Sequence, residues 1–226
     1  MTSVFGLLTR DPGRPRLTWY GDAGERVELS GAVLANWVTK TANLLVEEVD
    51  AGPHVRVRLD LPGHWRAVVW ALAVWRVGAC VVVGHDEPAT VTVTPDPAGH
   101  RGTVVAVALP ALARRFAGDL PPGAIDGAAV LGYGDALGWV PPPDLDAPAL
   151  AGPSVTVGHT ALVRPVAAGR VLLLADFVPL DELLRRVLDA LAADGSVVLV
   201  GGTAAGALRD DDERRAALVA SERVTG

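Results

Sequence analysis

The chain has 226 residues, a formal net charge of −6 and a hydrophobic content of 50%. This length suffices for one large domain or two small ones, and a mean hydropathy of +0.32 excludes an intrinsically disordered chain. The acidic balance argues against a nucleic-acid-binding surface, so we expect no nucleic-acid partner.

The first predicted elements are a hairpin and a long helix. Residues 1–16 lack a basic start and a long apolar run, so we expect no signal peptide and a cytoplasmic location. Leu17–Tyr20 and Arg26–Leu29 are two short strand-like runs around a Gly/Asp turn, which predicts a β-hairpin. Ser30 can cap a helix that continues to Val46.

Residues 54–83 have the pattern of a β–α–β unit. Apolar and polar residues alternate over Val55–Leu59, which predicts a strand with one buried face. Apolar residues then recur at helical spacing from Trp65 to Val77, and two arginines inside this run argue against a membrane span. Val81–Val83 is typical of a buried strand, and the single cysteine beside it, Cys80, indicates a buried structural thiol.

Polar side chains follow this strand at His85, Asp86 and Glu87. They are compatible with a metal or acid/base site, or with a solvated loop whose acids cap backbone groups. No further His or Cys lies nearby at ligand spacing, so we predict no metal site. Asp176 and Asp181, after a later strand, leave the same choice open between an acid/base pair and a helix cap.

The middle of the chain predicts two more strands, over 90–94 and 103–107, and a short helix over Ala111–Phe116. A stretch rich in Pro, Gly and Asp follows, including Pro141-Pro142-Pro143. Prolines in sequence favour a stiff extended spacer. We therefore predict that any division of the chain falls there.

The predicted division has three parts. Residues 1–140 form an N-terminal α/β segment, residues 141–153 a Pro-rich connector, and residues 154–226 a C-terminal α/β segment of the same sheet or an adjoining one. In the last part we expect buried strands over 170–174 and 196–200, with an amphipathic helix over 180–191 between them. The run Val197–Gly206 lacks the spacing of a dinucleotide loop, which favours a plain turn before a terminal helix over Asp210–Arg223.

The order of these motifs resembles a known superfamily. The strand Leu17–Tyr20, the following helix, the strand Val55–Leu59 and the Gly78-Ala79 step into a valine strand resemble the opening of the acyl-adenylate-forming, or AMP-binding, enzymes. That superfamily includes acyl-CoA synthetases and peptide-synthetase adenylation domains. The whole chain is similar to a family of short actinobacterial proteins that match only the front part of those enzymes. The resemblance implies an α/β fold with a mainly parallel sheet and helices on both faces, like their N-terminal subdomain.

The same resemblance implies where the phosphate-binding loop would lie. Gly152, Ser154, Thr156 and Gly158 stand at the matching position as possible remnants, but the consecutive Ser-Gly-Thr-Thr-Gly run and its lysine are absent. Counterparts of the enzymes' nucleotide-binding parts and second half are not found either. We therefore expect no adenylation activity, no catalytic residue and no cofactor.

The leading hypothesis is a catalytically degenerate relative that binds a partner protein or a small acyl- or nucleotide-like ligand. The alternative is an enzyme of different chemistry with an acid/base or metal site at His85, Asp86 and Asp176. A third reading is a subunit that completes another chain, and the oligomeric state stays open. We expect the tryptophans to pack in the core, whereas an exposed subset would indicate an interface: Trp37, Trp65, Trp70, Trp75 and Trp139.

Overall fold

A computed structural model describes residues 2–226, with side chains from Val4 onward. The chain forms two compact units, each built from separated segments. The first unit contains the residues up to Ala35, Pro62–Val68 and Val163–Gly226; the second contains Asn36–Leu61 and Val69–Leu162. The predicted division is of another kind, since it cuts the chain once, at residues 141–153. It stays a prediction.

The second unit is built on a seven-stranded sheet in the order β7-β6-β5-β3-β4-β8-β9. Every neighbouring pair is parallel except β8 and β9. The predicted β–α–β unit is confirmed, because β3 and β4 lie parallel with Val57 opposite Val81. The strands are β3 (Arg56–Leu59), β4 (Cys80–Val82), β5 (Val91–Thr94), β6 (Thr103–Ala106), β7 (Ile125–Asp126), β8 (Pro148–Ala151) and β9 (Thr156–Gly158).

The first unit is built on a four-stranded sheet in the order β10-β11-β1-β2. The strands are β1 (Pro15–Tyr20), β2 (Arg26–Ser30), β10 (Arg170–Leu174) and β11 (Ser196–Val200). The hairpin prediction is confirmed by the antiparallel pairing of β1 with β2, while β11 lies parallel to both β1 and β10.

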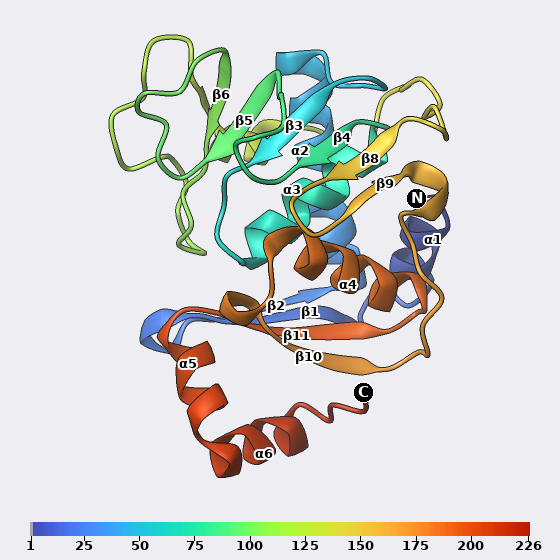
Figure 1. Ribbon diagram of the computed structural model, residues 1–226, viewed down its shortest axis with the longest axis vertical. Coiled ribbons are helices and arrows are strands. Elements are labelled where there is room, and N and C mark those ends of the chain that lie inside the picture. Colours follow the sequence, from blue (N-terminus) through green and yellow to red (C-terminus); the bar gives the residue numbers. More distant parts are fainter. Residues whose placement is uncertain (1) are drawn as a thin grey trace. The chain divides into compact units, whose positions relative to one another are not determined.

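Helices cover both faces of this sheet, as expected (Figure 1). On one face, α4 (Leu180–Ala192) packs against β10 and β11, and α1 (Thr2–Arg10) packs against α4. On the other face, Val198 and Val200 of β11 pack against Ala205 and Leu208 of α5. α5 spans Thr203–Asp210, and α6 (Asp212–Ser221) follows it.

Two long helices complete the fold, α2 (Gly31–Val49) and α3 (Trp65–Arg76). The Trp75 indole N–H of α3 donates to the Ala149 carbonyl of β8 at 2.8 Å. Trp65, Trp70 and Trp75 are buried, as predicted, but Trp139 is 84% exposed and the core prediction is wrong for it. Four 3₁₀ turns span Asp22–Gly24, Gly127–Gly132, His159–Ala161 and Ala175–Phe177.

The helix predicted over Ala111–Phe116 does not form; the structure has turns there. A stretch of six residues is too short to sustain a helix without packing on one face. Instead, the Phe116 amide donates to the Asp126 carboxylate at 2.9 Å.

The predicted plain turn after β11 leads directly into α5, a helix that the sequence did not indicate. The cap comes from a distant residue, because the Asp22 carboxylate accepts bonds from the backbone N–H and the hydroxyl of Thr203, both at 2.7 Å. Gly202 lies at φ +64°, and a Cβ there would meet the Asp22 carboxylate at 2.4 Å. A glycine is therefore required for this approach.

Buried Arg16 and half-buried Asp194 form a clamp in the first unit. The Arg16 guanidinium is fully buried and lies 2.7 Å from the Asp194 carboxylate. It also donates to the carbonyls of Leu7, Asp194 and Gly195 at 2.9–3.0 Å. The start of β1 is thereby fastened to α1 and to the turn between α4 and β11.

We expect Asp194→Asn to lower the free energy of unfolding by about 2 kcal/mol, because it leaves the buried guanidinium without a countercharge. Asn tolerates the left-handed backbone at this position, which has φ +60°. Urea denaturation measures the change. The control, Asp210→Asn, removes an exposed ion pair with Arg209 and should cost less than about 0.5 kcal/mol; equal effects would refute the clamp.

His64 is buried among Trp19, Trp65 and Glu25 in the same unit. Its ring lies 4.5 Å from that of Trp19, and its Nδ1 accepts a bond from the Arg66 amide at the start of α3. Burial lowers the pKa of His64 to about 4, against the opposing attraction of Glu25. The native protein therefore holds this imidazole neutral.

This burial predicts a loss of stability in mild acid. An unfolded histidine binds a proton near pH 6.5, so stability should fall as the pH drops from about 6.5 toward 4, by up to about 3 kcal/mol. Asparagine can still cap α3 but does not titrate. His64→Asn should therefore flatten this part of the pH–stability curve in urea titrations; an unchanged slope would show that other groups cause it.

Candidate functional site

The residues that match the phosphate loop lie on the β8–β9 hairpin of the second unit. Thr156 and Gly158 belong to β9, while Gly152 and Ser154 lie in the turn that joins the two strands. Ala151 pairs with Thr156 across the hairpin. The region that the resemblance assigns to a phosphate loop is thus the end of a hairpin between two antiparallel strands.

The turn between these strands is short and closed. It contains four residues, 152–155, and the Gly152 amide donates to the Val155 carbonyl at 2.9 Å. Pro153 has no N–H to offer. A phosphate cradle needs several backbone N–H groups converging on one point. Beyond Gly152, this turn contains only the amides of Ser154 and Val155, which is a small number for such a cradle.

Positive charge is also missing from this hairpin. Residues 141–163 contain no Lys or Arg. His159 follows β9, and its Nε2 lies 3.1 Å from the Gly78 carbonyl. Burial lowers the pKa of His159, although the bond to Gly78 opposes this. The imidazole is therefore neutral at physiological pH and gives a phosphate no countercharge.

The loop after β4 is held by arginines of β3. Arg56 contacts the Glu87 carboxylate at 2.7 Å, and Arg58 donates to the Gly84 and Glu87 carbonyls at 3.0 and 2.6 Å. His85 and Asp86 are exposed. These contacts favour the reading of this loop as a solvated turn.

The remaining predicted acids lie in the first unit. Asp176 is exposed in a 3₁₀ turn after β10, and Asp181 is fully buried in the first turn of α4, where it accepts from the Glu182 amide at 3.0 Å. His85 and Asp86 belong to the second unit. Among residues 2–226, no group of three His, Cys, Asp or Glu side chains is arranged to hold a metal ion.

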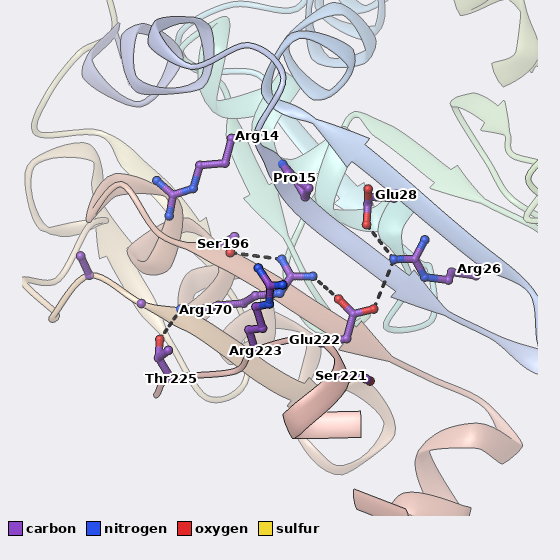
Figure 2. A pocket seen from close by; sticks show the side chains of 12 residues that line it. Arg14, Pro15, Arg26, Glu28, Arg170, Ser196, Ser221, Glu222, Arg223 and Thr225 are labelled. Carbon is purple, nitrogen blue, oxygen red and sulfur yellow. Dashed lines mark hydrogen bonds and ion pairs between the residues drawn. The ribbon is translucent and has the colours of Figure 1, made fainter. Parts of the chain in front are cut away.

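Sequence reasoning missed a charged cavity of about 620 Å³ in the first unit (Figure 2). We call it the arginine cavity, and its charged lining is Arg14, Arg26, Arg170, Arg223, Glu28 and Glu222. These residues come from both ends of the sequence and meet because β1 pairs with β11. The only signal in the sequence is that β10 and β11 each begin with a polar residue, Arg170 and Ser196.

Arg170, the first residue of β10, lines the arginine cavity. Its guanidinium donates to the Ser196 hydroxyl at 3.2 Å, to the buried Thr18 hydroxyl at 2.9 Å and to the Glu222 carboxylate. Three partners from β11, β1 and the segment after α6 therefore fix its orientation. Such a charged group is held in place before any ligand arrives.

Glu222 is the shared acceptor of the cavity. It receives bonds from Tyr20, Arg26 and Arg170. Burial opposes its ionisation, but the bonds from Tyr20, Arg170 and Arg26 outweigh burial and hold the pKa of Glu222 below its ordinary value. Arg26 also contacts Glu28 at 2.7 Å.

Two further arginines line the cavity, and carboxylates neutralise their charge less completely. Arg14 lies 3.8 Å from Asp194, on the carboxylate oxygen that Arg16 already contacts at 2.7 Å. Arg223 makes no ion pair within the part of the chain that the structure describes. Figure 2 shows it among the side chains that line the cavity. The cavity thus presents positive charge that the protein itself does not neutralise.

Two other predictions can be compared with the structure. Cys80 is buried, as expected, and burial raises the pKa of its thiol. None of the described helices combines the length and apolar character required to cross a membrane.

Solved structures show the same fold at low sequence identity. The N-terminal subdomain of Klebsiella oxytoca NpsA matches with a TM-score of 0.64 and 15% identity, over 99% of this chain and 59% of that chain. A Brucella canis acyl-CoA synthetase matches with a TM-score of 0.67 and 17% identity, over 88% of this chain and 43% of the enzyme. The acetoacetyl-CoA synthetase of Streptomyces lividans matches with a TM-score of 0.63 and 15% identity, over 88% of this chain and 38% of that enzyme. The chain therefore spans about half the length of these proteins, and its fold is that of the N-terminal subdomain of acyl-adenylate-forming enzymes.

A relative of matching length identifies the family. No family model matches the sequence. A protein of Mycobacterium tuberculosis strain H37Rv, described as a TIGR03089 family protein, is 38% identical over 97% of this chain and 93% of its own length. At that identity and coverage, the chain belongs to the TIGR03089 family.

Proposed function

We propose that the protein is a catalytically degenerate relative of the acyl-adenylate-forming enzymes, which binds a small ligand and does not activate an acid with ATP. The closed turn between β8 and β9 carries this proposal. Its Gly152 amide is used by the Val155 carbonyl, and Pro153 interrupts the series of donors. ATP-dependent activation needs the triphosphate held in line with the acid. A turn with so few amides, in a stretch of residues 141–163 without Lys or Arg, offers few groups that could hold a triphosphate in this way.

Two cavities in the first unit support ligand binding. The arginine cavity offers fixed positive charge to an anionic group. A second cavity of about 380 Å³ lies along α5 and α6, with an apolar lining that includes Val200, Leu208 and Leu218. It would suit an apolar group such as a short acyl chain. Volumes of this size are typical of small-molecule sites.

A partner protein is the second candidate, and one observation favours it. Trp139 is 84% exposed in the irregular segment of the second unit. Tryptophan is enriched among the residues that dominate binding at protein interfaces. An enzyme of different chemistry at His85, Asp86 and Asp176 has less support, because Arg56 and Arg58 already hold the loop that contains the first two.

Purified protein mixed with ATP, Mg²⁺ and a panel of carboxylic acids should release no pyrophosphate above the rate without protein. An active acyl-CoA synthetase serves as the positive control. The double variant Ser154→Ala/Thr156→Ala is the matched control for the hairpin and should behave as the unmodified protein does. Acid-dependent pyrophosphate release that this double variant abolishes would contradict the proposal.

If Trp139 anchors a partner, Trp139→Ser should remove that partner from material purified out of the native host. The change should leave the free energy of unfolding within about 0.5 kcal/mol, because an exposed side chain contributes little to the fold. Leu112→Ser, at a position 92% exposed, is the control and should retain the partner. The same proteins recovered with both variants would rule out this role of Trp139.

A further inference from the structure

We propose that the arginine cavity binds a phosphate monoester of a small polar molecule, such as a sugar or polyol phosphate. This inference names a ligand class and rests on the proposed binding function. It starts from the charges of the lining, where four guanidinium groups face two carboxylates, an excess of two positive charges. A phosphate monoester carries about two negative charges above its second pKa, near 6.

The excess lies on Arg223 and on Arg14, whose ion pair is a 3.8 Å contact with the Asp194 oxygen that Arg16 already contacts at 2.7 Å. Both carboxylates of the cavity are already engaged, Glu222 by Arg26 and Arg170, and Glu28 by Arg26. An incoming anion therefore meets neutralised glutamates and two arginines with free donors. Guanidinium groups bind phosphate oxygens through paired, charge-assisted hydrogen bonds, which gives both strength and orientation.

The backbone of Arg223 also points to a role beyond folding. Arg223 follows α6 with φ +53°, in the left-handed region where glycine is preferred. The neighbouring chain fixes it there, since Val224 donates to Val219 at 3.0 Å and Thr225 donates to Arg170 at 2.8 Å. An arginine at this position has a backbone cost and makes no ion pair among residues 2–226 in return. Strain of this kind is common at binding sites.

The rest of the lining indicates the character of the organic group. Besides its charged side chains, the cavity is lined by the hydroxyl residues Ser196, Ser221 and Thr225 and by small residues such as Gly169. No large apolar side chain takes part. Carboxylates and hydroxyls pair well with the hydroxyl groups of a sugar or polyol, whereas an acyl chain would meet only the small apolar side chains of Pro15 and Ala168.

Isothermal titration calorimetry in phosphate-free, low-salt buffer tests the inference. The probes are glucose 6-phosphate, glycerol 3-phosphate, inorganic phosphate and glucose. We expect the protein to bind at least one of the two esters, to bind inorganic phosphate more weakly than that ester, and not to bind glucose. Affinity should fall as salt is added, because the contacts are between charges.

The decisive variant is Arg223→Gly. It removes the guanidinium but relieves the backbone, so binding of the ester should weaken about ten- to a hundredfold while the melting temperature stays equal or rises. Arg186→Ala removes one positive charge from an exposed position on α4, outside the cavity. This control should leave binding unchanged.

Three results would overturn the inference. The first is no binding of any phosphate compound at millimolar concentration. The second is an equal loss of affinity in Arg223→Gly and Arg186→Ala, which would mean unspecific attraction to charge. The third is inorganic phosphate binding as tightly as both esters, which would mean that the cavity does not recognise the sugar or polyol group. The proposed lack of acid activation is tested separately, by pyrophosphate release. A failure of that proposal can therefore be distinguished from a failure of the phosphate-monoester inference.

Discussion

Parallel pairing of β1 with β11 is the constraint on which the first unit depends. It sets Leu17 opposite Val197 and Tyr20 opposite Val200, and so joins residues about 180 positions apart in one sheet. The Arg16–Asp194 clamp holds the same two segments at the start of β1. One face of the resulting sheet supports α4 and the other supports α5 and α6. The arginine cavity exists only because this pairing brings both ends of the sequence together.

Two regions of this protein can be compared as candidates for holding a phosphate. The sequence resemblance placed a phosphate loop at the β8–β9 turn, yet the turn is closed by the bond between Gly152 and Val155, and residues 141–163 contain no Lys or Arg. At the arginine cavity nothing in the resemblance suggests a site, yet Arg170 is held rigidly by Thr18 and Ser196. Charge and orientation, the two requirements for binding phosphate, are the reason that we place the proposed site in the arginine cavity.

The sequence predicted the elements that short-range periodicity defines. The β1–β2 hairpin and the β3–α3–β4 unit follow from alternation, helical spacing and turn residues within a few tens of positions. It could not predict α5, because the cap at Thr203 is supplied by Asp22. The arginine cavity was missed for the same reason. Its charged residues lie between positions 14 and 223, and only tertiary pairing shows that they meet.

A crystal structure of the protein soaked with ATP and with the tighter-binding ester, glucose 6-phosphate or glycerol 3-phosphate, tests the account most directly, because it shows where an anion binds. The account predicts phosphate density between Arg14, Arg170 and Arg223, and no nucleotide phosphates at residues 152–158. A triphosphate surrounded by the backbone amides of that turn, with the arginine cavity filled by water alone, would contradict it.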